Sequence, residues 1–216
     1  MIDQGAKGGN METLSRNGLE VNFQWQLRTL ERLCATAVCL PFPGKRQKLI
    51  DQVLSLGLPR EIAKDTMPFL MVLGRAVLLY QQLFAIKYQD QAGKIKDGGS
   101  RLIPGKIVDD ENEGMDGVYC LLGVSFNRIN EKMSAGEAIE EMKGANGACL
   151  FNAREVIGLA LQKPELCEDG LLILGSQYGK EGILALRLEK DKPVLVVIES
   201  KESVTGYWGP VCRERF

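Results

Sequence analysis

The fold of this chain is decided by residues 171–198, which read LLILGSQYGKEGILALRLEKDKPVLVVI. Three apolar runs of strand length lie within this stretch, at Leu171–Leu174, Ile183–Leu188 and Val194–Ile198. The segments between them carry glycine, serine, aspartate and lysine, which are typical of turns. The pattern therefore predicts three strands connected by hairpins.

Two short helices are predicted just before this meander. Ser134 and Glu137 have the spacing of a capping box, in which each side chain bonds the backbone N–H of the other residue. Asn152 and Glu155 have the same spacing. The first box opens a helix to about residue 142. The second opens a helix that stops before Pro164, because the residue that precedes a proline avoids helical geometry.

Helical spacing also dominates the N-terminal third. Apolar residues recur at helical intervals over about 23–39 and 45–56, and Gly57 and Pro59 supply a stop after the second segment. We expect these two helices to pack as an antiparallel pair around one apolar seam. The start of the first helix is ambiguous, because the apolar residues of 21–27 also alternate as a strand would.

The middle of the chain is less regular. Phe69–Leu73 and Val118–Val124 are compact apolar runs that predict buried strands. Residues 76–88 fit a helix slightly better than a strand. Residues 89–116 contain a glycine pair and an acidic run, and we expect a mobile loop there, since the acidic run lacks the ligand pattern of a calcium loop.

Together these patterns predict the α+β class, with an N-terminal helical pair followed by a mainly antiparallel sheet and two short flanking helices. Residues 1–18 hold four glycines among polar residues and are expected to be a disordered lead-in. Residues 19–216 are expected to form a single domain. Its helical part covers about 22–66 and its sheet-containing part about 67–216.

The composition excludes several classes of partner. The chain has 216 residues and a formal net charge of -1, so no nucleic-acid partner is expected, because phosphate binding needs a basic face. No apolar run reaches the ~18–20 residues that span a bilayer, so no membrane partner is expected either. The first residues lack the pattern of a secretory signal, which indicates a soluble protein of the cytoplasm. The chain has no histidine, which removes every mechanism that depends on imidazole.

Six cysteines are spread along the chain, at Cys34, Cys39, Cys120, Cys149, Cys167 and Cys212. None forms a C-x-x-C pair, and we expect no metal site and no cofactor. Most lie in apolar runs, which indicates small core residues in a reducing compartment. Cys212 differs because Arg213 follows it, and a neighbouring cation favours the reactive thiolate, although a catalytic cysteine would normally also need a base.

Six residues are candidates for ligand binding: Glu155, Ser176, Tyr178, Tyr207, Trp208 and Arg215. They offer an acid–base group, hydroxyls, aromatic rings and a cation around a cleft near the 175–180 hairpin and the C-terminal segment. Each also has a structural interpretation. Glu155 fits the partner of a helix cap, residues 175–180 fit a hairpin loop better than a phosphate loop, and Tyr207 with Trp208 fits a docked C-terminal segment. The carboxylates of 137–141 fit a solvated helix surface, and no catalytic residue is assigned.

The second half of the chain resembles an uncharacterised bacterial family that is known as a domain of unknown function. The resemblance covers roughly residues 117–216 and rests on a series of short motifs in the same order: Tyr119–Leu122, Arg128–Asn130, Glu137–Ile139, Asn152 with Glu155, Pro164–Leu166, Leu174–Ser176, Trp208–Gly209, Cys212 and Arg215. Gln177 stands where the family has arginine. The resemblance implies no activity, but it indicates that this half is a structural unit.

Two functional hypotheses follow. The first is a non-enzymatic binding or interaction module, whose partner is another protein or a second copy of the chain. The absence of histidine, of metal-ligand spacing and of a nucleotide loop favours it. The alternative is a small-ligand-binding protein, or an enzyme that works without histidine, with the six candidate residues around its cleft.

Overall fold

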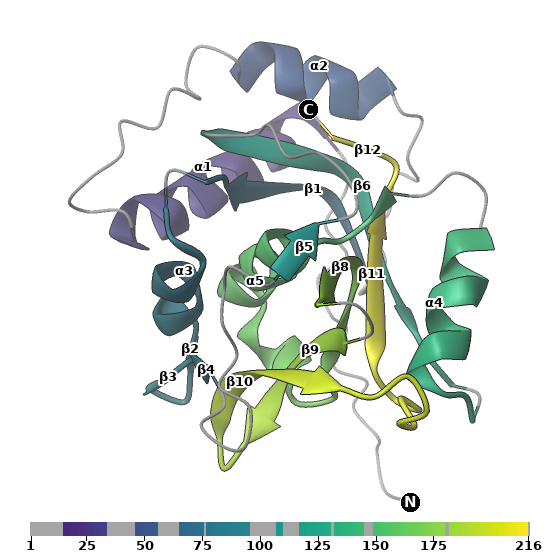
Figure 1. Ribbon diagram of the computed structural model, residues 1–216. Helices are drawn as coiled ribbons and strands as arrows, with labels where there is room; N and C mark the ends of the chain where they lie inside the picture. Colours follow the sequence, from purple (N-terminus) through teal and green to yellow (C-terminus); the bar gives the residue numbers. More distant parts are fainter. Residues whose placement is uncertain are drawn as a thin grey trace, which may run out of the picture.

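A computed structural model gives the fold over residues 15–33, 46–55, 65–75, 77–95, 107–109, 117–130, 132–144, 149–179 and 182–215. Over these residues one ten-stranded sheet organises the chain (Figure 1). Its main path runs through β1 (Thr66–Leu73), β6 (Val118–Arg128), β11 (Trp208–Cys212), β8 (Leu171–Tyr178), β9 (Gly182–Glu189), β10 (Lys192–Ile198) and β4 (Lys94–Ile95). Three short strands pair off this path, β5 (Ile107–Asp109) with β8, β7 (Cys149–Leu150) with β11, and β12 (Glu214–Arg215) with β6.

The predicted α+β class and the predicted meander are both confirmed. β8 pairs with β9 and β9 with β10, each time antiparallel, so residues 171–198 form the hairpins that their pattern indicates. The helical pair comes first in the chain, as α1 (Arg16–Leu33) and α2 (Arg46–Ser55). The two flanking helices are α4 (Ala135–Gly144) and α5 (Ala153–Gln162), and a short 3-10 helix, η3 (Pro164–Cys167), follows α5.

The sheet curves around α5, which lies in its hollow (Figure 1). Most of this helix is buried, because its apolar residues face both ends of the sheet at once. From β1 and β6 it meets side chains such as Val72 and Leu121, and from β8 and β9 it meets Ile173 and Leu184. The main core of the protein is therefore the inside of the curve.

The outer face of the sheet is covered by helices at both ends. α1 and α2 bury a stripe of leucine, isoleucine and phenylalanine side chains against the outer residues of β1 and β6, among them Phe69, Met71 and Leu122. α4 covers the outer residues of β8, β9 and β10, among them Leu172, Ala185 and Val196. Three layers result, with α5 and α3 inside, the sheet in the middle, and α1, α2 and α4 outside.

The outer edge of β1 is closed by a side chain from α1. Gln26 is fully buried, and its Nε2 donates a hydrogen bond to the carbonyl oxygen of Phe69 at 2.9 Å. Its Oε1 accepts a hydrogen bond from the backbone N–H of Met71 at 2.8 Å. The amide of Gln26 thus occupies the place of a peptide group from a further strand. It satisfies backbone groups that would otherwise be buried without partners.

β1 and β6 reverse their faces together at one point. Met67 and Val124 are register partners that face α5, whereas the next pair, Phe69 and Leu122, faces α1 and α2. The register places Pro68 opposite Gly123 between them, and Gly123 has a φ of 59°, which a glycine adopts without strain. This pair therefore lets both strands keep apolar residues on both covered faces.

Two expectations about the N-terminal boundary need correction, and one open alternative is settled. α1 begins at Arg16 rather than near residue 23, because Ser15 caps it through a hydrogen bond from the backbone N–H of Gly18 to its Oγ at 3.0 Å. Arg16–Gly18 are therefore helical and not part of a disordered lead-in. The alternating pattern of residues 21–27 forms no strand. Residues 1–14 and 34–39 lie outside the described part of the chain.

The section expected to be a mobile loop, 89–116, contains paired strands. β4 adds to the edge of β10 and β5 pairs with β8, while β3 (Gln91–Ala92) forms a two-stranded ribbon with β2 (Lys87–Tyr88). These strands form because they pair with other segments of the chain. Such pairing leaves no periodic pattern of apolar residues in the local sequence. Residues 96–106 and 110–116 lie outside the described residues. Just upstream, the helix favoured over 76–88 is confirmed for Leu79–Ala85 as α3, whereas Lys87–Tyr88 belong to β2.

Replacing Gln26 with alanine is expected to lower the free energy of unfolding by about 2–6 kcal/mol. The change leaves the Phe69 carbonyl and the Met71 N–H buried without partners, at roughly 1–3 kcal/mol each. Urea denaturation monitored by circular dichroism measures the loss. Gln24→Ala on the same helix is the matched control and should change stability by less than about 0.5 kcal/mol. Equal losses from both variants would contradict the role of Gln26.

Candidate functional site

The N-terminus of α5 is the most highly connected polar site among the candidates. Asn152 caps this helix, and its Oδ1 accepts a hydrogen bond from the backbone N–H of Glu155 at 3.0 Å. In return, Oε2 of Glu155 accepts one from the backbone N–H of Asn152 at 2.8 Å. The capping box expected from the sequence is confirmed, as is the one between Ser134 and Glu137.

Glu155 also forms a buried ion pair with Arg215 of β12. Arg215 Nε lies 2.6 Å from Glu155 Oε1, and Arg215 Nη2 lies 3.0 Å from Oε2, so the guanidinium binds both carboxylate oxygens. The side chains are 0 % exposed for Glu155 and 6 % for Arg215. Nη2 also donates to the carbonyl oxygen of Leu150 at 2.7 Å. A bidentate pair of this kind is strong and fixes the orientation of both groups.

The surroundings keep the guanidinium of Arg215 charged. Burial alone would lower the pKa of Arg215, but the hydrogen bonds and charge of Glu155 outweigh it and hold that pKa above its usual value. Burial, and then the charge of Glu155, raises the pKa of Tyr119, whose phenol donates to Glu155 Oε1 at 3.4 Å. Each carboxylate oxygen of Glu155 therefore has two donors, and neither oxygen is free to take a proton from a substrate.

Ser176 completes the same helix end. β8 has a bulge between Ile173 and Gln177, and the bulge turns Ser176 toward α5. Its Oγ accepts a hydrogen bond from the backbone N–H of Ala153 at 2.8 Å. The adjacent Gly175 leaves room for the backbone of residues 150–152, since a Cβ there would lie 2.7 Å from the carbonyl oxygen of Leu150. The Leu-Gly-Ser motif of residues 174–176 thus positions the first turn of α5.

Tyr207 and Trp208 have separate sets of partners. The phenol oxygen of Tyr207 accepts a hydrogen bond from Arg187 Nη1 at 3.0 Å, and Arg187 also pairs with Glu202. The indole of Trp208 donates to Asp169 Oδ2 at 3.2 Å. Arg128 lies over the indole ring at 5.3 Å and pairs with Asp169 as well. These contacts hold the C-terminal segment on the sheet, where Trp208 begins β11.

The six candidate residues therefore do not surround one cleft. Glu155, Ser176 and Arg215 meet at the N-terminus of α5, where they serve the helix and the chain end. Tyr207 and Trp208 lie at the other end of β11, and Tyr178 packs partly buried against the main core at the end of β8. The common cleft expected from the sequence is not formed by these side chains.

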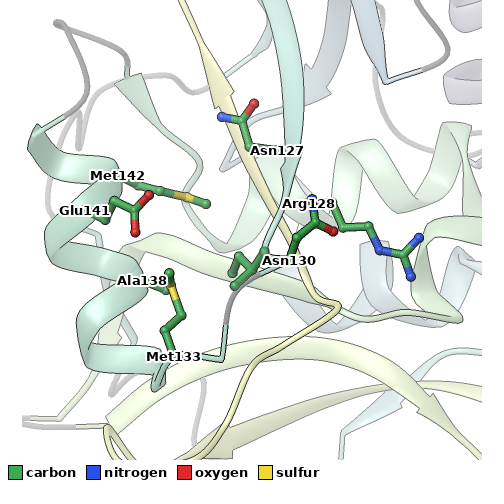
Figure 2. A pocket seen from close by; sticks show the side chains of 8 residues that line it. Asn127, Arg128, Asn130, Met133, Ala138, Glu141 and Met142 are labelled. Atoms are coloured by element: carbon green, nitrogen blue, oxygen red, sulfur yellow. The ribbon is translucent and has the colours of Figure 1, made fainter.

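A cavity lies instead between the end of β6 and α4 (Figure 2). Its volume is ≈ 320 Å³, and it is lined by Asn127, Arg128, Ile129, Asn130, Met133, Ala138, Glu141 and Met142. The three α4 residues, at positions 138, 141 and 142, share one helix face because residues three and four apart are neighbours on a helix. The guanidinium of Arg128 points away from the cavity, so Arg128 lines it with the rest of the residue (Figure 2).

The cavity was not identified from the sequence. Glu141 was expected on a solvated surface, and it is exposed, but it also borders this hollow. The sequence feature that could have indicated the cavity is the polar end of a long apolar strand, Asn127 to Asn130. One wall also depends on Gly209 of β11, because a Cβ there would collide with the thioether of Met142. That contact joins segments far apart in the chain, and no local pattern reveals it.

Other kinds of site receive no support from the described residues. No group of three or more Asp, Glu, Cys or His side chains in this part of the chain is placed to hold a metal ion. No helix among the same residues is long and apolar enough to cross a membrane. No protein-family model, curated protein or solved structure matches the chain. Function therefore has to be inferred from the geometry of the chain itself.

Replacing Arg215 with alanine is expected to lower the free energy of unfolding by about 3–5 kcal/mol, because it leaves the carboxylate of Glu155 buried without its counter-charge. Urea denaturation measures the loss. The double variant Glu155→Gln/Arg215→Met should be more stable than Arg215→Ala, since no uncompensated charge remains. Lys201→Ala, which removes the exposed pair with Glu199, is the control and should cost less than about 0.5 kcal/mol. A small effect of Arg215→Ala would contradict the role of the pair.

Proposed function

We propose that this chain is a non-enzymatic binding protein and that the cavity between β6 and α4 is its ligand site. The observation that carries the proposal is the cavity itself, with a volume of ≈ 320 Å³ and a mixed apolar and polar lining. This volume falls near the lower end of the ~300–1,000 Å³ that is typical of small-molecule pockets. A compact ligand would fill it.

The apolar lining favours a ligand with a short hydrocarbon or aromatic body. Ile129, Met133, Ala138 and Met142 are the apolar residues that line the cavity. Methionine side chains are flexible and polarisable, so they adapt to ligands of different shape. Burial of apolar ligand surface against them would supply the main part of the affinity.

The polar lining favours a ligand that carries a positively charged amine. Asn127, Asn130 and Glu141 border the cavity, and their side chains form no hydrogen bond with another described residue. Glu141 brings a carboxylate to the cavity, whereas the guanidinium of Arg128 is turned away toward Asp169. An ammonium group would bond to the carboxylate of Glu141 and to the amide oxygens of the asparagines.

The non-enzymatic part of the proposal is supported by the state of Glu155. This residue was the candidate general acid or base, and both of its oxygens are engaged by Arg215, Tyr119 and Asn152. The chain also has no histidine to replace it. We further propose the cytoplasm as the setting, in line with the free thiols of the described cysteines, and membership of the bacterial family that residues 117–216 resemble.

Phenethylamine is expected to bind the wild-type chain and to raise its thermal unfolding midpoint, with 3-phenylpropionate as the probe of opposite charge. Glu141→Lys should abolish the shift with the amine, because it places a cation where the ammonium group would lie. Glu140→Lys, an exposed neighbour on α4 that does not line the cavity, makes the same charge change and should retain the shift. Equal shifts with both probes, or equal loss in both variants, would overturn the proposal.

A protein partner is the second candidate, favoured by an exposed aromatic pair on α3. The rings of Tyr80 and Phe84 lie edge to face at 6.2 Å, and the side chains are 40 % and 50 % exposed. Aromatic residues are enriched in protein interfaces. If this face binds a second copy, Tyr80→Ser/Phe84→Ser should reduce dimer formation in sedimentation equilibrium and leave amine binding unchanged. A monomeric wild-type chain would exclude this partner.

A further inference from the structure

Two cysteines lie directly opposite each other on neighbouring strands. β7 and β11 pair antiparallel, and their register places Cys149 opposite Cys212 and Leu150 opposite Val211. Opposite residues in an antiparallel pair have Cα atoms ~4.5–5.5 Å apart and side chains on the same face of the sheet. A disulfide spans Cα separations of ~4.4–6.8 Å, so this pair is within bonding reach without a rearrangement of the strands.

The two thiols are neighbours while they are reduced. Cys149 and Cys212 are both free, and the Cys149 side chain is one of the groups that raise the pKa of Cys212. Sγ of Cys149 also lies 4.0 Å from the carbonyl oxygen of Arg213, the residue that follows Cys212. The register and this distance both place the Cys149 side chain beside the segment of β11 that carries Cys212.

The two thiols differ in how a reagent can reach them. Cys149 is partly exposed, whereas Cys212 is only 1 % exposed. Burial, and then the charge of Glu155, raises the pKa of Cys212 above its usual value, so this thiol stays protonated. Cys120 and Cys167 are fully buried, and burial raises the pKa of Cys167 to about 12. Among the described cysteines, Cys149 is thus the one that an oxidant in solution can reach.

We propose that Cys149 and Cys212 form an oxidation site that reacts with a hydroperoxide to give an intramolecular disulfide. The thiolate of Cys149 attacks hydrogen peroxide, which breaks the O–O bond and gives the sulfenic acid and, after proton transfer, one water. The sulfur of Cys212 then attacks the sulfenic sulfur, its proton leaves with the hydroxyl as a second water, and the S–S bond forms. Two thiols and one peroxide yield one disulfide and two waters.

The bond would join two segments that hold the N-terminus of α5. Cys149 precedes Leu150, whose carbonyl oxygen accepts the hydrogen bond of Arg215, and Cys212 precedes β12, which carries Arg215. Oxidation therefore adds a covalent link beside the buried ion pair between Glu155 and Arg215. Because the link closes a long loop of chain, it reduces the entropy of the unfolded state and stabilises the oxidised form.

The test treats the reduced full-length chain with hydrogen peroxide under native conditions, blocks the remaining thiols with iodoacetamide and digests the product with trypsin. The expected product joins the tryptic peptides 144–154 and 202–213, each of which contains a single cysteine. Dithiothreitol should separate them again. The oxidised chain should also unfold at a higher temperature than the reduced chain.

Three variants make the assignment specific. Cys212→Ser removes the resolving thiol, so Cys149 should accumulate as a sulfenic acid that dimedone captures. Cys149→Ser should leave Cys212 reduced at the same peroxide concentration. Cys167→Ala, the matched control at another buried cysteine, should still form the link. Oxidation of Cys149 without the link in the wild-type chain, a bond from Cys149 to any other cysteine, or resistance of both thiols to peroxide would overturn the proposal.

Discussion

The buried N-terminus of α5 is the constraint on which the rest of the structure depends. The first turn of any helix has backbone N–H groups without helical partners, and in the interior of a protein they cannot bond to water. Here the side chains of Asn152 and Ser176 accept hydrogen bonds from the backbone of Glu155 and Ala153. The carboxylate of Glu155 in turn requires the guanidinium of Arg215. These hydrogen-bond and charge requirements fix the positions of β8 and of the C-terminal residues.

That requirement explains why the last strands of the chain occupy the middle of the sheet. β11 pairs with β6 along one side and with β8 and β7 along the other, and β12 continues along β6 and carries Arg215. Pro210 is tolerated in this central strand. The backbone N–H of Trp208 donates a hydrogen bond to the carbonyl oxygen of Gly170 on the side of β8. Pro210 has no N–H, and its nitrogen, two residues later, faces the gap between β8 and β7.

The same structural requirements account for the six candidate residues. The residue types that suggested a binding site also serve structural roles. A buried helix end and a strand packed on the sheet both use carboxylates, hydroxyls, arginines and indoles that have hydrogen-bond partners. Glu155, Ser176 and Arg215 meet as a result, but they stabilise the fold. The cavity forms between α4 and the end of β6, and its lining contains none of the six candidate residues.

The sequence by itself determined the elements whose signals are local: the meander of residues 171–198, the capping boxes at Asn152 and Ser134, and the helical pair at the N-terminus. Each depends on residues a few positions apart, which a pattern records directly. Only the tertiary structure decided the position of β11, the cavity beside α4 and the pairing of Cys149 with Cys212. These depend on contacts between distant segments, and such contacts exist only once the chain has closed around α5.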